Sequence, residues 1–299
     1  MQAPKVIKDS GNLLRGFKHS LVCSLCANSD CILSEESYPC RMNSNDLIEQ
    51  EERIQNTIRN KYVKLDLKSK PIYDGVVNPE QYVSSCPRIL WVLKEAYDGG
   101  MEYNRPDEGG WSLAGLLNDE PHRMSRGRAF QPICYVDYGI RNKIYDWNSA
   151  SMPYLRDCEQ MRLGIRNIAF INVSKMPGLR SSPLGRIEEA YGENRSIILD
   201  QIKTYLPHVI FACSPHADLL LKDLAPGQKW QEFGSASAVM ISPVTRFVRV
   251  RHPSQRGKRG VYVNDAIRVA VVDLPSIDIL PNKFAGANVE ATHSLGARA

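Results

Sequence analysis

The sequence predicts an α/β protein, a three-layer sandwich around a central, mainly parallel sheet of four strands. Short continuous apolar runs alternate with segments of helical periodicity, which is typical of strands buried on both faces of a parallel sheet. The chain has 299 residues, of which 43% are hydrophobic and 24% are charged, as in ordinary globular proteins. We expect an α/β domain over 44–275, after a cysteine-rich module over 1–43 and before a tail over 276–299 that is extended or disordered.

Composition narrows the class of protein. No run of apolar residues approaches the length of a membrane span, and the N-terminal stretch "MQAPKVIKDSGNLLRG" lacks the apolar core of a signal peptide. We therefore expect a cytoplasmic monomer that does not bind membranes. The formal net charge of +5 permits a polyanionic partner without requiring one.

Four of the eight cysteines are clustered near the N-terminus. In a reducing cytosol such a cluster favours a metal site over disulfides. Thiolates at this spacing can complete a tetrahedral zinc site or hold a 4Fe–4S cluster. Because the set is contiguous, we predict one structural Zn2+, with the iron–sulfur cluster as the alternative and unliganded thiols also open. The predicted ligands are Cys23, Cys26, Cys31 and Cys40.

The first element after this module is a predicted helix in "SNDLIEQEERIQNTIRNKYVKL". Ser44 or Asn45 can cap its N-terminus. Ile54, Ile58 and Tyr62 recur at the four-residue spacing that places side chains on one helical face. This face is expected to pack on the rest of the domain.

Strands and helices then alternate. Helical patterns occur in "WSLAGLLN", "IEEAYGENRSIILDQIKTYL", "PHADLLLKDL" and "VYVNDAIRVAVVDL", and Ser214 is expected to cap the third of these, with Pro215 in its first turn. Residues 99–165 break the alternation and are interpreted as a long polar and aromatic insertion between the first two strands. The four predicted strands are 88–93, 168–173, 209–214 and 246–250.

Each predicted strand delivers a polar group at its carboxyl end, the edge where functional groups gather in open parallel sheets. The first strand is followed by "KEAYD", the second ends in "NVSK", the third in serine, and the fourth leads into "HPSQRGKRG". We expect a site where these ends meet. The polar residues there are Glu95, Asn172, Ser214 and His252.

These motifs resemble the uracil-DNA glycosylase superfamily, over roughly residues 86 to 272. "KEAYD" is similar to the Gly-Glu-Ala-Pro-Gly motif of the iron–sulfur branch, "FINVSKMPG" to the second motif of the family, and "HPSQRGKRG" to the third. The resemblance implies a monofunctional DNA glycosylase, which flips a base out of DNA, hydrolyses its N-glycosidic bond and leaves an abasic site. It implies DNA as the partner and base excision, in DNA repair or antiviral defence, as the role.

The residue types fit that chemistry. A carboxylate can orient water and stabilise a cation-like sugar, which is the role predicted for Glu95. An imidazole can stabilise the departing base anion, which is the role predicted for His252. Asn172 can read the edge of the flipped base, Trp111 can stack on its face, and Tyr97 can close the pocket beside its 5-position.

The basic segment after the fourth strand is predicted to contact DNA. A serine there can clamp a phosphate, the residues after it can enter the base stack, and the cations beyond can hold the flanking backbone. A lysine shortly after Asn172 is assigned to DNA as well. The predicted DNA contacts are Ser254, Gln255, Arg256, Lys258, Arg259 and Lys175.

Other interpretations remain open. Glu95 can be an ordinary strand-end carboxylate paired with Lys94 or Arg105, Asn172 a loop cap, and Trp111 part of the core. A non-catalytic nucleic-acid-binding protein or a nucleotide-processing hydrolase would carry many of the same features.

The base itself is also open. Lys94 and Tyr97 replace a glycine and a proline of the iron–sulfur branch, and the 99–165 segment is long. These departures favour a modified base, such as the bulky 5-substituted cytosines with which some viruses mask their genomes, over uracil. Removal of such a base would defend a host against phage.

Overall fold

In the computed structural model of the chain, residues 42–63, 69–97, 109–178, 183–255 and 257–271 are described. All of them belong to one compact unit, residues 32–299. The four clustered cysteines and the predicted C-terminal tail lie outside the described residues. Among the described residues, no helix combines the length and the apolar character that a membrane crossing requires.

The centre of the fold is a parallel sheet formed by the four predicted strands. β2 pairs in parallel with β3 on one side and with β4 on the other, and β4 pairs in parallel with β7. The prediction of these strands is confirmed within one or two residues at each end. Their bounds are β2 Ile89–Leu93, β3 Ile168–Asn172, β4 Val209–Cys213 and β7 Thr245–Val250.

The prediction of a four-stranded sheet is wrong, because the described residues form a mixed sheet of seven strands in the order β1-β3-β2-β4-β7-β6-β5. β1 (Gly75–Val76) pairs antiparallel with β3 at one edge. At the other edge β6 (Ala236–Ser242) pairs antiparallel with β7, and β5 (Gln231–Phe233) pairs antiparallel with β6. The added strands extend the sheet outward and leave the parallel centre intact.

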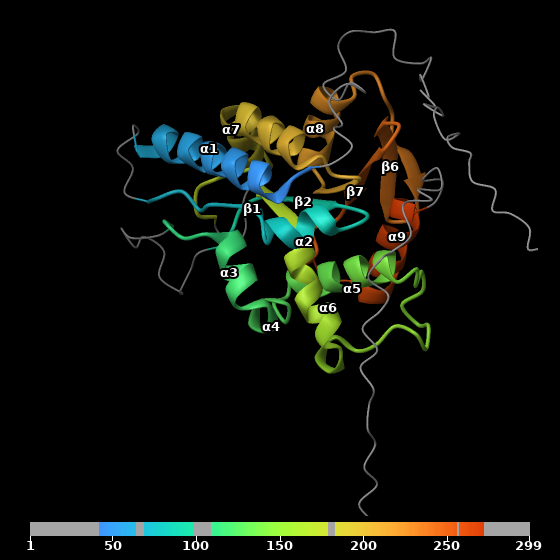
Figure 1. Ribbon diagram of the computed structural model, residues 1–299. Helices are drawn as coiled ribbons and strands as arrows, with labels where there is room; N and C mark the ends of the chain where they lie inside the picture. The colour runs from blue at the N-terminus through green and yellow to red at the C-terminus, as the bar shows by residue number, and fades with distance from the viewer. Residues whose placement is uncertain (1–41, 64–68, 98–108, 179–182, 256, 272–299) are drawn as a thin grey trace, which may run out of the picture. The chain divides into compact units, whose positions relative to one another are not determined.

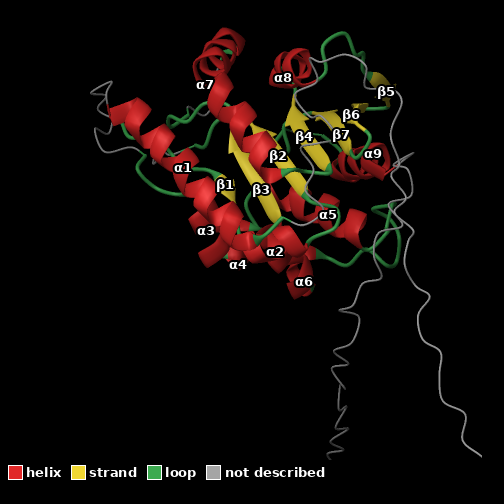
Figure 2. Cartoon of the chain, turned by 45° about the horizontal axis from the view of Figure 1, so that its top comes forward, coloured by secondary structure: helices red, strands yellow, loops and turns green. Residues whose placement is uncertain are grey.

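Helices cover both faces of the sheet, as predicted (Figures 1 and 2). On one face α1 (Ser44–Val63), α7 (Leu184–Tyr205) and α8 (His216–Leu224) enclose an apolar cluster with the short α2 (Pro79–Ser84). On the other face α5 (Phe130–Arg141) and α9 (Arg259–Val271) enclose a second cluster.

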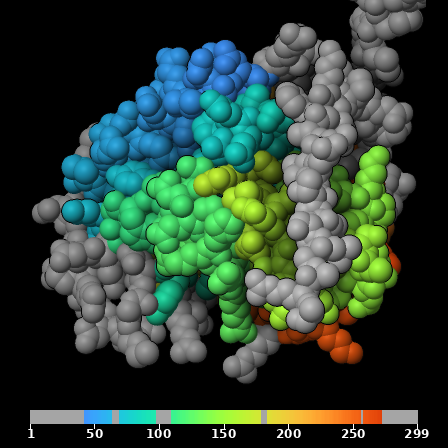
Figure 3. All heavy atoms as spheres, turned by 60° about the horizontal axis from the view of Figure 1, so that its bottom comes forward, coloured from blue at the N-terminus to red at the C-terminus, as the bar shows by residue number. Residues whose placement is uncertain are grey.

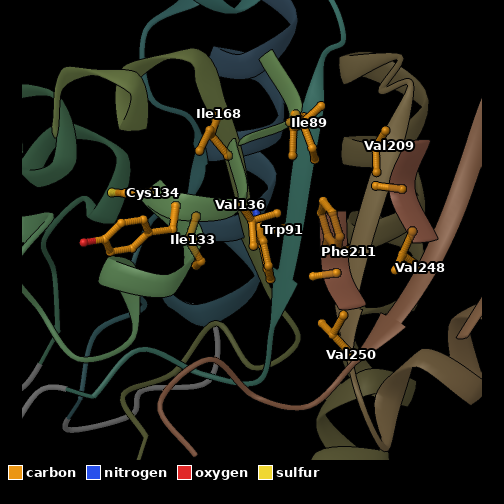
Figure 4. Close-up of a cluster of buried hydrophobic side chains, with 14 of the residues drawn as sticks. Ile89, Trp91, Ile133, Cys134, Val136, Ile168, Val209, Phe211, Val248 and Val250 are labelled. Carbon is orange, nitrogen blue, oxygen red and sulfur yellow. The ribbon is translucent and has the colours of Figure 1, made fainter. Parts of the chain in front are cut away.

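The strands are apolar throughout because their side chains alternate between these two clusters. Trp91 belongs to the cluster beneath α5 and α9, whereas its neighbours Leu90 and Val92 belong to the cluster beneath α7. Across the sheet Trp91 stacks on Phe211 of β4, with ring centroids 4.4 Å apart (Figure 4). Val136 of α5 reaches the same cluster. This packing fixes the relative position of the strand ends that carry the predicted site.

The described part of the 99–165 stretch is more than an insertion, because its helices supply part of one layer. Ile133, Val136 and Ile140 of α5 are buried in the core. The shorter helices are α3 (Leu113–Asp119), α4 (Pro121–Met124) and α6 (Glu159–Leu163), with 3-10 turns η2 (Leu155–Asp157) and η3 (Gly164–Asn167). In Figure 3 these segments, green to yellow-green, form much of the surface turned to the viewer.

Two local predictions can be compared directly. α1 buries Ile54, Ile58 and Tyr62, so the predicted apolar face is confirmed. α8 begins at His216 with Pro215 in the N-cap position and no side-chain cap, so the predicted capping role of Ser214 is wrong. The backbone N–H of Ser214 donates instead to the carbonyl oxygen of Val250, at 2.8 Å.

Candidate functional site

The carboxyl ends of the parallel strands lie at one edge of the sheet and bring the predicted site residues together. Leu93 of β2 is in register with Asn172 of β3, and Glu95 follows two residues after Leu93. His252 follows β7, which is separated from β2 by β4. The charge of Lys94 lowers the pKa of both Glu95 and His252, which places these two groups in one electrostatic environment.

Glu95 is a buried carboxylate close to a cation. Its side chain is only 5% exposed, and its Oε1 lies 3.6 Å from Nζ of Lys94. Burial raises the pKa of Glu95, whereas the charges of Lys94 and Arg186 oppose that rise. A carboxylate held in this way can orient water or accept a proton. The contact with Lys94 also agrees with the alternative of a paired strand-end carboxylate, and the other partner considered, Arg105, lies outside the described residues.

Gly178 packs against Glu95, a contact that the sequence did not reveal. A Cβ atom at Gly178 would lie 1.9 Å from Cγ of Glu95, so only glycine leaves room for this side chain. The backbone N–H of Gly178 donates to the carbonyl oxygen of Ala96 at 2.8 Å. The glycine that ends "FINVSKMPG" therefore belongs to the wall around Glu95.

Asn172 presents a buried carboxamide at the end of β3. The residue is 1% exposed, and neither Oδ1 nor Nδ2 has a hydrogen-bond partner among the described residues. Leaving such groups unpaired is unfavourable by about 1–3 kcal/mol, so these atoms are well suited to a ligand. The backbone N–H of Asn172 donates to Oδ2 of Asp74 at 2.6 Å, which fixes the strand end.

Lys175 is held inside the protein by Asp74. Its side chain is fully buried, and its Nζ lies 2.8 Å from Oδ1 of Asp74 and 2.8 Å from Oε1 of Gln201. Burial lowers the pKa of Lys175, whereas the charge of Asp74 raises it. A buried, paired ammonium cannot reach a phosphate. The assignment of Lys175 to DNA contact is therefore contradicted, and so is its interpretation as a solvated surface lysine.

His252 is positioned by Ser254. Nδ1 of the ring accepts a hydrogen bond from the backbone N–H of Ser254 at 3.2 Å, and the hydroxyl oxygen of Ser254 lies 2.7 Å from the same nitrogen. A backbone N–H can only donate, so the ring proton sits on Nε2. Burial lowers the pKa of His252 to about 4, and the charge of Lys94 acts in the same direction. Near neutral pH the ring is thus uncharged and offers Nε2–H as a donor.

A second histidine, His216, lies buried beside this group and was missed from the sequence. Its Nε2 is 3.0 Å from the carbonyl oxygen of Val92, and its Nδ1 is buried without a partner among the described residues. Burial lowers the pKa of His216 to about 4, with smaller contributions from His252 and Lys94 in the same direction. No local pattern distinguishes this histidine, because its role depends on β2, more than a hundred residues earlier.

The two predicted aromatic residues differ in their surroundings. Trp111 precedes the N-cap Ser112 of α3, so it does not open the helix, and it packs partly buried against the core. The backbone just before it reaches the loop of Gly178, since a Cβ at Gly109 would lie 3.1 Å from Cγ of Pro177. Tyr97 pairs through its backbone with Gly178 and is 54% exposed.

The basic segment after β7 borders a cavity of about 350 Å³ next to His252. Of the residues predicted to contact DNA, Gln255, Lys258 and Arg259 line this cavity, and Arg256 lies outside the described residues. Two lining cations were not predicted, Arg251 and Arg128. Arg128 comes from the stretch before α5, within the 99–165 segment whose length was one of the departures that favoured a modified base.

The predicted metal ligands Cys23, Cys26, Cys31 and Cys40 lie outside the described residues. Within the described part of the chain, no group of three or more His, Cys, Asp or Glu side chains is arranged to hold a metal ion.

A scan against protein-family models and a search of curated proteins each found no match to the chain. Function must therefore be inferred from the site.

Proposed function

We propose that the protein is a monofunctional DNA glycosylase that extrudes a pyrimidine from DNA and hydrolyses its N-glycosidic bond. The observation that carries this proposal is the unpartnered, buried carboxamide of Asn172. Asn172 is in register with Leu93, two residues before the buried carboxylate of Glu95. The neutral imidazole of His252 follows β7 at the same edge of the sheet. Together they offer a base-reading group, a carboxylate and a hydrogen-bond donor.

In the proposed reaction the bond between C1′ of the sugar and the base nitrogen breaks, and the base leaves with the bonding electrons. Nε2–H of His252 donates a hydrogen bond to the base anion. Glu95 stabilises the cation-like sugar and orients the water that attacks C1′. The carboxylate accepts the proton of that water and returns it to solvent or to the departed base. Its raised pKa suits this acceptance.

Recognition of the base is assigned to three residues. Asn172 donates and accepts hydrogen bonds at the base edge, since its carboxamide has both functions and no partner among the described residues. Trp111 stacks on the face of the base, and Tyr97 borders its 5-position. A flipped base is read in this way, by edge contacts and by stacking, in enzymes that act on extruded nucleotides.

The substrate base is proposed to be a modified, bulky 5-substituted cytosine or uracil, with a role in antiviral defence or in base-excision repair. The sequence departures at Lys94, at Tyr97 and across 99–165 support the modified base. The amide of Asn172 can pair with the edge of either a cytosine or a uracil, because its orientation can be reversed.

The test is to incubate the full chain with duplex DNA containing uracil, with virally modified DNA and with unmodified DNA, and to score alkali-labile sites. Glu95→Gln should abolish base release while DNA binding persists. Glu188→Gln, an exposed change on α7, is the matched control and should behave as wild type. Equal base release by Glu95→Gln and wild type would remove Glu95 from the mechanism. No abasic product from any DNA would refute the glycosylase.

A nucleotide-processing hydrolase is the second candidate, because the cavity beside His252 has the volume of a small-molecule site. Release of base from free nucleotides, unaffected by Lys258→Ala, would identify that activity. Salt-sensitive DNA binding without abasic product would identify a non-catalytic DNA-binding protein.

A further inference from the structure

The cavity beside His252 is built from two segments that are far apart in the sequence. Arg128 and Pro132 come from the stretch at the start of α5, and the remaining lining residues lie between 251 and 262. We call it the Arg128 cavity. Its volume of about 350 Å³ is about tenfold the roughly 30 Å³ that one water occupies in the liquid. The space is large enough for a phosphate together with its sugar.

The charged side chains that line the Arg128 cavity all carry the same sign. Four cations line the cavity, and no aspartate or glutamate is among the lining residues. None of the ion pairs between described residues involves any of the four. Unpaired cations that converge on one concave site favour an anion, and guanidinium groups match the geometry of phosphate. The four cations are Arg128, Arg251, Lys258 and Arg259.

Tyr262 lines the same cavity and carries a neutral hydroxyl. Its hydroxyl is buried and has no hydrogen-bond partner among the described residues. Burial keeps the pKa of Tyr262 well above its usual value, so the phenol stays protonated. Its O–H can donate to a phosphate oxygen, while its ring and Pro132 offer apolar walls to a sugar. A phosphate placed here would satisfy a donor that is otherwise unpaired.

We propose that the Arg128 cavity binds a sugar–phosphate unit of the DNA strand beside the extruded nucleotide, so that Arg128 gives the 109–165 segment a direct part in DNA binding. This inference rests on the proposed function, because the cavity borders His252. It adds a contact with the DNA backbone to the role that Trp111 of the same segment has in the proposed function. It also distinguishes Arg128 from other surface arginines nearby.

The test compares Arg128→Ala with Arg126→Ala, a control two residues away that is exposed and does not line the cavity. Both are made in the full-length Glu95→Gln chain, and binding to a labelled duplex is measured by fluorescence anisotropy over a series of salt concentrations. Loss of one phosphate contact should lower the slope of log K against log salt by about 0.9. Arg126→Ala should keep the slope of its parent. Equal slopes for the two variants would overturn the proposal.

Tyr262→Phe supplies a second readout that does not change the charge. It should weaken duplex binding at every salt concentration and leave the slope unchanged, because only a hydrogen bond is lost. Unaltered binding would exclude the hydroxyl from the phosphate site.

The phosphate bound in the cavity can belong to DNA or to a free small molecule. Binding of inorganic phosphate and of a free nucleoside monophosphate distinguishes these two sources. Suppose that either compound raises the melting temperature of wild type but not that of Arg128→Ala, while Arg128→Ala leaves the salt slope of DNA binding unchanged. That result would identify a site for free phosphate and overturn the DNA assignment. Base release is tested separately with Glu95→Gln. Failure of the phosphate-site proposal can therefore be distinguished from failure of the glycosylase proposal.

Discussion

Asp74 holds both the backbone of Asn172 and the ammonium of Lys175. One carboxylate oxygen accepts from the N–H of Asn172 at 2.6 Å, and the other lies 2.8 Å from Nζ of Lys175. The backbone of the residue that would read a base is thus fixed by a buried ion pair. The pair positions Asn172 and has no direct contact with DNA in the proposed reaction.

Asp74→Asn should strongly destabilise the fold, because it leaves the buried Lys175 without its counter-charge. Breaking a buried pair in this way lowers the free energy of unfolding by about 3–5 kcal/mol. Chemical denaturation measures this change. Asp74→Asn combined with Lys175→Met should recover part of the loss, since the double variant also removes the buried Lys175 charge that Asp74→Asn leaves without its partner. A double variant less stable than Asp74→Asn alone would contradict this account of the pair.

Asn172→Leu should stabilise the protein and abolish base release. The leucine replaces an unpartnered buried amide, whose presence is unfavourable by about 1–3 kcal/mol. Denaturation midpoints and the assay for alkali-labile sites give the two readouts. A stable variant that still releases base would show that Asn172 does not read it.

Gly178→Ala should impair base release by displacing Glu95. The added methyl would overlap Cγ of Glu95, and a displacement of about 1 Å at a reacting group can slow a reaction about 10²-fold. Gly192→Ala is the matched control, since a Cβ there meets nothing within 4 Å. Single-turnover rates would show the difference, and equal rates for the two variants would argue against the contact.

His252→Ala should slow base release about 10²–10³-fold, the usual effect of removing one preorganised donor to an anion. Ser254→Ala should slow it less, because the ring keeps its Nε2–H but loses the hydroxyl contact at Nδ1. Single-turnover rates at saturating enzyme measure both. If Ser254→Ala weakens DNA binding and leaves the rate unchanged, the serine serves as the phosphate clamp and not as the support of the ring.

The contribution of His216 and His252 to stability should fall as the pH is lowered from about 6.5 to 4, because both have folded-state pKa values of about 4. Between these limits each of the two histidines binds more protons in the unfolded chain than in the folded one, so its contribution to the free energy of unfolding decreases with falling pH. Each histidine contributes up to about 1.4 kcal/mol per pH unit. His216→Gln should flatten the profile when denaturation is followed across this range. The exposed change His122→Gln provides the comparison, and a His216→Gln profile as steep as that of His122→Gln would disprove the contribution.

The sequence predicted the parts of the fold that have a continuous local signal. The parallel strands are apolar on both faces, and α1 repeats its buried residues every four positions. β1 was missed because two residues carry no periodicity, and β5 because its exposed Gln231 and Glu232 give no apolar pattern.

The candidate site was predictable only where a motif carries it. Glu95, Asn172 and His252 stand at strand ends that the apolar runs identify. Asp74 and Gly178 act through partners remote in the sequence, so no local pattern reveals them. Lys175 was assigned wrongly because closeness to Asn172 along the chain does not reveal the direction of a side chain, which Asp74 determines.

The position of β4 in the sheet separates the two strands that lead to Glu95 and to His252. β4 lies between β2 and β7, so the strands that lead to Glu95 and to His252 are two strand intervals apart, or roughly 10 Å. A free base or a lone phosphate is too short to bridge that interval, whereas a sugar joined to its base can lie across the end of β4. In the proposed reaction, this spacing favours an intact nucleoside unit for contact with both strand ends, and that double contact is lost once the N-glycosidic bond is broken.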